Sequence, residues 1–497
     1  MRKTALVLIA FLAATAWVGA QDVEDMINEV GDDASGIQDL LGLDVGLGVQ
    51  TFANPEFDPL NPGTAQEYLT YQSVDLQPDL AIGPFGLGLD LTLNFTFTGG
   101  ENGDEFQIRE EDWIPTEDRT FLEIYLPKFR YIRWGQKGQP LFIQAGTIDN
   151  GTLGNGFIMG NYSNAQFLPD RRIFGLSFDL DGRLFEFPYV GFESFIANLA
   201  QFDVMGGRLF VRPIAWADIP IIQNFELGGT FVVDTQPFLH AQKDPESPYF
   251  VGLDSPTPAP DDANVLIWGL DFQQPIITAD FFSLSAFGDI VSQTATLDEL
   301  PDPTSPPTDP GAASTGGMVG FGGRILGVIN YGAQVRIMGE DFIPVYFDNA
   351  YDLFRVRKYQ IYSGEIEGPP EYAGYFATLG FAFLEEAIRF NVSLAGPFDT
   401  AAEDPGASFK NPRLRGEFVL EEGLLGGLSF EASYDKQNIT DIADLISPVD
   451  AVIGARINYR TGPAVISLVY DVKYDPYTNS EDPWIITSGL ESSISLF

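Results

Sequence analysis

Residues 451–475 contain two runs in which apolar and polar side chains alternate strictly, joined by the Thr-Gly-Pro sequence at 461–463. The apolar faces of the two runs end in Tyr459 and Tyr474, while the opposite faces carry charged side chains. A period of two residues is typical of a β-strand. Each run is about 10 residues long, the length of a tilted strand that crosses a bilayer. The pattern therefore predicts a β-hairpin with one face in lipid and the other in a watery lumen.

The same alternation recurs from residue 43 to the C-terminus. It is clearest over residues 87–98, where Leu and Phe alternate with Gly, Asp, Thr and Asn. Tight turns, such as residues 83–86, alternate with long connections, such as residues 99–119. Short periplasmic turns and long extracellular loops are typical of outer-membrane barrels. We therefore expect an all-β fold, a transmembrane antiparallel up-and-down β-barrel of about 20 strands, within a range of about 16 to 20.

One connection departs from this alternation. A turn is predicted at residues 205–207, between strands over residues 190–203 and 209–215, and it is short where a long loop is due. The sequence offers no reason for this exception.

The N-terminus has the features of a secretory signal peptide. Arg2 and Lys3 precede an apolar run over residues 5–18, and small residues at 18–20 supply a cleavage site. The chain has no Cys, which excludes a lipoprotein anchor and disulfides, and no later run approaches the length of a transmembrane helix. We expect three parts: a signal peptide (1–20), a periplasmic leader or small plug (21–42) and an outer-membrane β-barrel (43–497).

The chain is strongly acidic, with a formal net charge of −43. Such a chain is not expected to bind nucleic acid or an anionic membrane surface by electrostatics. Much of the negative charge falls in the predicted loops, where two interpretations are open. The loops are solvated and self-repelling, or they bind divalent cations that bridge to lipid headgroups and enrich cations at a pore mouth.

Charged residues at inward-facing positions are the candidates for a role in permeation. A barrel of 16 or more strands is too wide for its own side chains to fill, so a lumen is implied. Opposed basic and acidic walls would set a transverse field across this lumen and orient polar solutes. The alternative is that these charges pair with neighbours and only fill space. The basic candidates are Arg324, Arg336, Arg389, Arg413, Arg415, Arg456 and Arg460. The acidic candidates, all in the N-terminal half, are Asp90, Asp179, Glu226 and Asp234.

Residues 151–164 form an unusual long loop, rich in Gly and with little charge. An exposed outer loop has no reason to be apolar, so we expect this one to fold inward and narrow the lumen. An outer loop that packs on its own neighbours is the alternative. The candidate constriction residues are Gly151, Gly154, Gly156, Phe157, Ile158, Met159 and Asn161.

Catalysis finds little support in the sequence. The only histidine, His240, lies in a Pro-rich loop rather than on a rigid element, and there is no Cys. Neither a zinc-binding constellation nor a phosphate-cradling motif is present. We expect no enzyme activity, no cofactor and no metal.

The chain ends in Phe497, and with this ending and the strand pattern it resembles the bacterial outer-membrane porin-like β-barrels. The resemblance covers most of residues 43–497 at the level of architecture, without a family-defining motif. It implies an outer-membrane location, contact with outer-membrane lipid, and recognition of Phe497 by the barrel-assembly machinery. Many such barrels are homo-trimers. The ending departs from the usual pattern, because Glu491, Ser493 and Ser495 stand where alternate apolar residues are expected.

Taken together, these features predict a porin, a transport channel for passive diffusion of small hydrophilic solutes through the lumen. A transporter of hydrophobic, fatty-acid-type substrates, plugged by residues 21–41, is a second possibility. A surface adhesin or antigen, anchored by the barrel and binding through its long acidic loops, is a third.

Overall fold

The computed structural model describes most of the barrel and two of its long connections. Its described residues are 41–53, 68–97, 106–115, 120–167, 172–217, 219, 221–243, 247–251, 257–260, 263–279, 281–294, 313–384, 387–399, 412–436, 439–441, 443–446, 451–461, 464–474 and 484–495. The predicted signal peptide, nearly all of the leader, and Phe497 lie outside these ranges.

The described residues form one antiparallel sheet of 22 strand segments. None of the described helices is long and apolar enough to cross a membrane. The strands are β1 (Leu41–Ala53), β2 (Tyr68–Ile82), β3 (Phe85–Leu89), β4 (Leu91–Phe97), β5 (Phe106–Ile108), β6 (Phe129–Trp134), β7 (Leu141–Gly146), β8 (Gly175–Asp181), β9 (Val190–Ile196), β10 (Val204–Val211), β11 (Glu226–Asp234), β12 (Val265–Ala279), β13 (Phe282–Thr294), β14 (Ala313–Ile325), β15 (Ile329–Met338), β16 (Tyr372–Phe383), β17 (Ile388–Pro397), β18 (Arg413–Leu425), β19 (Leu428–Lys436), β20 (Ala451–Thr461), β21 (Ala464–Tyr474) and β22 (Trp484–Ser495). The helices are α3 (Phe121–Tyr125), α4 (Tyr351–Tyr362) and the 3-10 turns η1 (Glu110–Asp112), η2 (Leu126–Lys128), η3 (Gly182–Phe185), η4 (Ile222–Asn224), η5 (Ala241–Lys243) and η7 (Ala443–Ile446).

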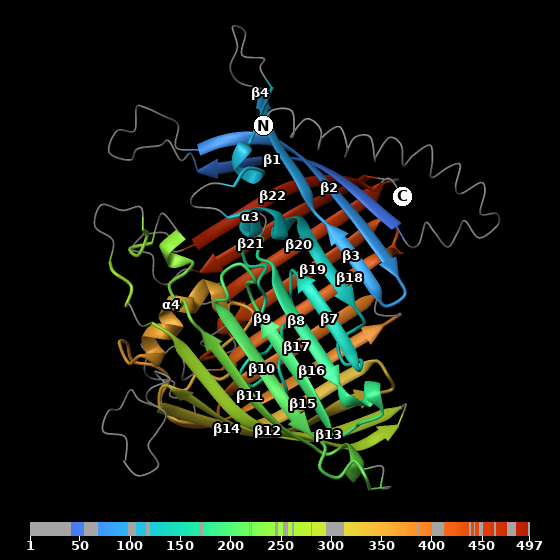
Figure 1. The fold of residues 1–497 in the computed structure, drawn as a ribbon, viewed down its shortest axis with the longest axis vertical. Helices are drawn as coiled ribbons and strands as arrows, with labels where there is room; N and C mark the ends of the chain where they lie inside the picture. The colour runs from blue at the N-terminus through green and yellow to red at the C-terminus, as the bar shows by residue number, and fades with distance from the viewer. Residues whose placement is uncertain are drawn as a thin grey trace, which may run out of the picture.

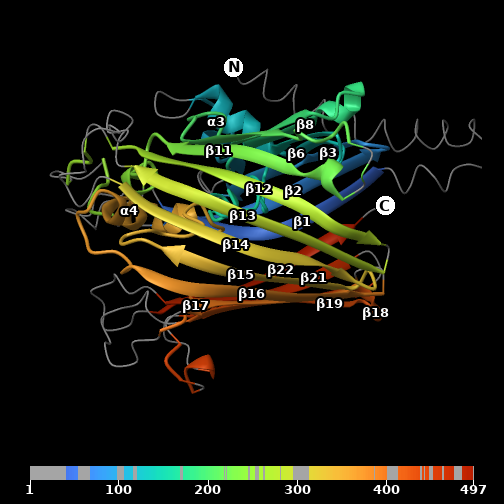
Figure 2. The same ribbon diagram turned by 90° about the horizontal axis from the view of Figure 1, so that it is seen from below.

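The strands follow one another round a barrel in chain order (Figure 1). β3 and β4 both pair with β2 and act as one strand interrupted at Asp90, and β5 and β6 share the next position. The 22 segments therefore occupy twenty positions. β1 also pairs with β22, over residues 44–47 against 492–495, so the ladder returns to where it begins. Seen from below, β11 to β13 lie on one side and β16 to β19 on the other (Figure 2). The predicted antiparallel up-and-down barrel of about twenty strands is confirmed.

Side chains alternate between the two faces of the wall, as a period of two requires. On β15, Val335 and Ile337 are 48% and 65% exposed, whereas Arg336 and Met338, which point inward, are 8% and 0% exposed. Large apolar side chains are exposed on the outer face of many other strands. They include Leu209, Phe231, Leu270, Ile290, Val319, Phe321, Leu468 and Tyr470. Apolar outer faces of this kind are typical of barrels that lie in lipid.

The connections alternate in length, with one departure from the predicted positions. The turn predicted at residues 205–207 is wrong, because these residues lie inside β10, and the connection from β9 to β10 is residues 197–203. Gly206 lies within the strand, and a Cβ there would stand only 2.8 Å from Val232 Cγ2 and 3.0 Å from Leu153 Cδ1. The glycine is needed because a loop packs closely on this strand from inside the barrel.

Two long connections fold into the lumen and pack on each other. They are the described residues between β7 and β8, namely 147–167 and 172–174, and residues 339–371, which contain α4. The backbones join where Val345 N–H donates to the Phe157 carbonyl at 2.9 Å and Gly160 N–H donates to the Phe347 carbonyl at 3.1 Å. Together with inward residues of β9 to β15 they bury one apolar cluster. Its members include Leu153, Phe157, Met159, Tyr162, Phe195, Val232, Ile267, Met338, Phe342, Phe347, Tyr351 and Tyr359.

Candidate functional site

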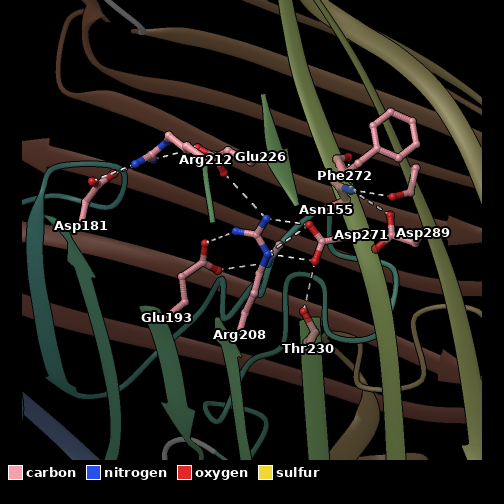
Figure 3. A network of polar contacts seen from close by, with 12 residues as sticks. Asn155, Asp181, Glu193, Arg208, Arg212, Glu226, Thr230, Asp271, Phe272 and Asp289 are labelled. Carbon is pink, nitrogen blue, oxygen red and sulfur yellow. Dashed lines mark hydrogen bonds and ion pairs between the residues drawn. The ribbon is translucent and has the colours of Figure 1, made fainter. Parts of the chain in front are cut away.

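A ladder of alternating charges lines the inner wall between β8 and β13 (Figure 3). At its centre is Arg208 of β10, which lies in register between Glu193 of β9 and Thr230 of β11. Its guanidinium donates from Nη1 to Glu193 Oε1 at 2.9 Å and from Nη2 to Asp271 Oδ1 at 2.6 Å. Arg208 is 1% exposed, so these charge-assisted bonds satisfy a cation that water does not reach.

The ladder continues toward the short-turn end of the barrel. Arg212, which follows β10, forms ion pairs with Asp181 at 2.6 Å and with Glu226 at 2.7 Å. Glu226 also lies 3.8 Å from Arg208 and so connects the two arginines. Asp181, Glu193, Arg208, Arg212, Glu226 and Asp271, the charge ladder, thus form one network along five neighbouring strands (Figure 3).

The tip of the loop over residues 147–167 binds to this ladder. The Gly154 N–H donates to Glu193 Oε2 at 3.0 Å, and the Asn155 Nδ2 donates to Asp289 Oδ2 of β13 at 2.9 Å (Figure 3). Gly154 has a φ of +55°, and a Cβ there would stand 3.0 Å from Arg208 Cδ. Both its backbone conformation and the close approach favour glycine. The loop is therefore held to the wall by polar contacts as well as by apolar packing.

Helix α4 is anchored to the same side of the barrel by a buried ion cluster. Arg355 donates from Nη1 to Asp203 Oδ2 at 2.9 Å and from Nη2 to Asp234 Oδ1 at 2.5 Å. Tyr351, one turn earlier on the helix, donates to Asp234 Oδ2 at 2.6 Å. Arg355 is 1% exposed, and although burial opposes its charge, Asp234 and Asp203 raise its pKa well above the ordinary value. This cation is therefore charged at every physiological pH.

Tyr162 connects the two inward loops to each other. Its hydroxyl lies 3.0 Å from both carboxylate oxygens of Asp352 on α4. His240 Nε2 lies 3.7 Å from Asp352 Oδ1, and its ring contacts Phe167. Burial by itself raises the pKa of Asp352, but His240, Arg355 and Tyr162 outweigh it and lower that pKa below the ordinary value. The carboxylate is thus ionised and shared between the two loops.

The other side of the segment over residues 339–371 reaches a different part of the wall. Lys358 Nζ lies 2.9 Å from Asp348 Oδ1, and Asp348 Oδ2 lies 3.5 Å from Arg415 Nη2 on β18. Burial raises the pKa of Asp348, but Lys358 and Arg415 lower it on balance. Six strands lie between β11, which Arg355 contacts, and β18. Residues 339–371, the strut, therefore bridge two separate parts of the barrel wall.

The predicted basic residues lie in three settings. Arg413 and Arg415 share Asp435 on the inner wall, at 2.5 Å and 2.8 Å. Arg336 is buried, bonds to Gln334, and lies against the Phe376 ring. The remaining four do not join this group. Arg389 pairs with Glu421 at 2.8 Å, Arg460 with Glu422 at 2.7 Å, Arg324 donates to Asn330 at 3.1 Å, and Arg456 stands opposite Glu431 in the β19–β20 register.

Each of the four predicted acidic residues contacts a cation. Asp90 pairs with Arg172, and Asp179 pairs with Lys137 at 2.9 Å. Glu226 and Asp234 pair with Arg212 and Arg355. This side of the lumen therefore carries cations as well as carboxylates, which the prediction did not include.

Arg212 lies within the predicted strand over residues 209–215, so it was Arg208 alone that the turn predicted at residues 205–207 concealed. A turn there interrupts the alternation that places Val204, Arg208 and Phe210 on one face of a single strand. The signal was available, because Leu209 and Val211 alternate with Arg208 and Phe210. Arg355 could not be placed in the same way, because it lies in a loop without strand periodicity.

The predicted constriction residues lie inside the barrel, mostly in its apolar cluster. Phe157, Ile158 and Met159 are buried, and the Phe157 ring stacks on Phe342 at 5.8 Å between centroids. Gly151 forms an isolated bridge with Tyr162. Gly154 contacts the ladder as described above, and Gly156 and Asn161 have positive φ angles of 78° and 53° at the bends of the loop.

Comparisons with known proteins concern the strand arrangement alone. No protein-family model matches the chain, and no curated protein matches its sequence. The structure is similar to that of OpdL from Pseudomonas aeruginosa, with 9% identity over 92% of this chain and 98% of that one and a TM-score of 0.30. It is also similar to Salmonella typhi OmpF in complex with daunomycin (10% identity, 85% and 96% covered, TM-score 0.29). A third is Wzi, an Escherichia coli outer-membrane protein described as a carbohydrate-binding β-barrel involved in group 1 capsule assembly (10% identity, 92% and 83% covered, TM-score 0.31). Similarities this low carry no conclusion about what the present chain does.

Proposed function

We propose that this protein is a bacterial outer-membrane channel for the passive passage of small hydrophilic solutes. The observation that carries the proposal is the polar inner wall of an otherwise apolar-coated barrel. Arg413, Arg415 and Asp435 face the lumen with side chains that are 21% to 32% exposed, and the charge ladder lines another part of the wall beneath the inward loop. Ionised groups are costly in an apolar interior, and their usual place in a membrane protein is a water-filled path.

In this proposal the two inward loops narrow the path and set what passes. The loop tip at Gly154 and Asn155 and the strut both occupy the lumen near β9 to β15. Solutes then cross between the strut and the wall that carries Arg413 and Arg415. The flanking charges orient polar solutes, as opposed charges do in other constrictions.

The proposal extends to the parts of the chain outside the described residues. Residues 1–20 direct export and are removed, residues 21–42 remain on the periplasmic side, and Phe497 is read during barrel assembly. Outer-membrane lipid then covers the apolar belt. No catalytic step is part of this function.

Planar-bilayer recording of the mature protein tests the proposal. We expect stepwise conductance, and in a salt gradient the reversal potential should move toward stronger cation preference when Arg415 is replaced by Gln. Lys243→Gln removes the same charge in the β11–β12 connection, where Lys243 is exposed, and should leave the reversal potential unchanged. Equal shifts in both variants would exclude Arg415 from the path.

A protein that folds and inserts into the bilayer but shows no conductance would overturn the channel proposal. A transporter of hydrophobic substrates would then be the next candidate. Binding of a fluorescent fatty acid to the non-conducting protein would support the transporter. Absence of binding would leave the surface adhesin as the remaining candidate function.

A further inference from the structure

Arg336 of β15 is a buried cation without a carboxylate partner. The residue is 8% exposed. Its guanidinium donates to Gln334 Oε1 from Nε at 3.0 Å and from Nη2 at 2.8 Å, so both bonds end on one uncharged oxygen. In the part of the chain that the structure describes, no carboxylate pairs with Arg336 and its Nη1 donates no hydrogen bond.

Two phenylalanine rings pack on this guanidinium. Its carbon atom Cζ lies 4.4 Å from the ring centroid of Phe376 and 5.7 Å from that of Phe157. Ring faces attract a cation, but they offer no full negative charge and leave Nη1 without an acceptor. Buried charges in proteins are usually paired with an opposite charge. The rings therefore account for the position of the guanidinium but leave its charge without a counter-charge.

The strands beside Arg336 supply no acceptor either. Arg336 stands opposite Met318 on β14 and opposite Gly374 on β16. Directly opposed residues are the ones whose side chains meet across a sheet. A methionine accepts hydrogen bonds only weakly and a glycine has no side chain, so neither cross-strand position provides a counter-charge.

A nearby group of ion pairs adds to the positive charge. Arg415 of β18 is close enough to Arg336 to repel it electrostatically. Arg415 belongs to a chain of ion pairs in which three cations share two carboxylates. The members of this chain are Lys358, Asp348, Arg415, Asp435 and Arg413. Arg336 therefore lies beside a group that already has one cation in excess, although the protein as a whole is strongly acidic.

We propose that a small monovalent anion, of the size of chloride, binds at Arg336. One negative charge offsets the one buried cation that lacks a partner, and Nη1 supplies a donor for it. A larger solute does not fit, because the Phe157 ring over the guanidinium is itself 2% exposed and stacks on Phe342 of the strut. The anion is a resident part of the fold and not a solute in transit, so it does not depend on whether the barrel conducts.

Such an anion helps to hold an inward loop on the wall. Phe157 belongs to the loop over residues 147–167, whereas Arg336 and Phe376 belong to β15 and β16. An ion that binds only to the folded arrangement of these residues stabilises that arrangement by mass action. The stability of the folded protein should therefore depend on the concentration of the anion.

Thermal unfolding of the purified protein in detergent tests the site. When chloride replaces gluconate, a much larger monovalent anion, at constant ionic strength, the midpoint should rise by about 2 °C or more and then level off. Arg336→Met should lose this dependence, because the cation that attracts the anion is gone. Arg389→Met is the matched control and should keep it, since the Arg389 side chain is 43% exposed and paired with Glu421. A native midpoint that ignores chloride, or an equal response in Arg336→Met, would overturn the proposal.

Diffraction with bromide locates the anion and does not require a variant to fold. Bromide is close to chloride in size and gives an anomalous signal. In crystals of the native protein grown with bromide in place of chloride, we expect an anomalous peak within hydrogen-bonding distance of Arg336 Nη1. Bromide peaks at exposed arginines such as Arg389, with none at Arg336, would indicate an adventitious ion only and would overturn the site.

Discussion

Arginine–carboxylate pairs on the two sides of the barrel have the same chemistry and opposite surroundings. On β10 and α4, the side chains of Arg208 and Arg355 and of their partners Asp271 and Asp234 are at most 2% exposed. Near the turns of β17 and β18, Arg389 and Glu421 are 43% and 50% exposed. The Arg355 pairs attach the segment that carries α4 to the wall, and Arg208 joins β10 to β9 and β12, whereas the exposed pair joins two strands that are already paired.

The difference shows that burial, more than distance, decides what such a pair does. Both kinds have N···O separations below 3 Å. Removing one partner of a buried pair leaves an uncompensated charge and costs about 3 to 5 kcal/mol, whereas an exposed pair contributes about 0 to 1 kcal/mol. Of the four predictions below, those at Arg355, Asp352 and Arg389 test this contrast, and Gly206→Ala tests the packing of the inward loop beside the buried pairs.

Replacing Arg355 by Met should have the largest effect. It leaves Asp203, Asp234 and Asp352 buried without their shared cation, so we expect the strut to lose about 3 to 5 kcal/mol of stability relative to the rest of the barrel. Limited proteolysis should then cut within residues 339–371 while the barrel stays heat-modifiable on gels. If Arg355→Met resists protease as well as the native protein does, the cluster does not hold the strut.

Gly206→Ala should have the next largest effect. Its Cβ would stand 2.8 Å from Val232 Cγ2 and 3.0 Å from the Phe231 carbonyl, so we expect a cost of about 1 to 3 kcal/mol and displacement of the loop at Leu153. Gly207→Ala is the matched control, because its nearest neighbours lie at an ordinary 3.4 Å. Thermal unfolding should separate the two variants, and equal midpoints would show that the inner packing tolerates the methyl group.

Acidification should release the strut over a definite pH range. Burial raises the pKa values of Asp348 and Asp352, but their cationic partners lower both below the ordinary 3.8. A carboxyl group with a lowered pKa stabilises the fold above its unfolded value and loses this contribution as pH falls through its folded value. Asp203, whose pKa burial raises despite Arg355, titrates in the opposite sense and weakens the effect. We expect protease resistance of residues 339–371 to persist at pH 5 and above and to fall below about pH 4.

Asp352→Asn checks this prediction. It should reduce the acid sensitivity and lower the resistance at neutral pH, since it removes the ionised carboxylate that the two loops share. An unchanged pH profile in this variant would assign the acid response to other groups.

Arg389→Met should have the smallest effect, a change in unfolding free energy below about 1 kcal/mol, because its pair with Glu421 is half exposed. Chemical denaturation of the folded barrel measures it. A loss comparable to that of Arg355→Met would contradict the rule drawn from the comparison.

The barrel could be predicted from the sequence because each strand repeats a simple physical requirement. Alternation such as that of residues 451–475 follows from one lipid face and one lumen face, and it needs no knowledge of distant residues. The prediction failed at residues 205–207, where Gly206 serves close packing by a loop from another part of the chain. Local patterns cannot distinguish that use from a turn.

The candidate site was predictable only in part. The apolar character of residues 157–159 is a local property, and it pointed to an inward loop, which is where the structure places these residues. The pairing of Asp234 with Arg355 joins residues 121 positions apart through a loop with no periodicity. Ion-pair partners of this kind depend on how the loops fold inside the barrel. The alternation of side chains along a strand does not identify these partners.

The strut restricts changes in the shape of the barrel, because it is attached to two separate parts of the wall. A hinged lid is fixed on one side and swings freely, but residues 339–371 are tied to the β9–β10 connection and to β11 through Arg355, and to β18 through Asp348. Any widening of the lumen at this level must break one of the two attachments or change the outline of the barrel itself. The width of the passage therefore changes only together with the cross-section of the barrel. Lateral pressure in the surrounding membrane acts on both.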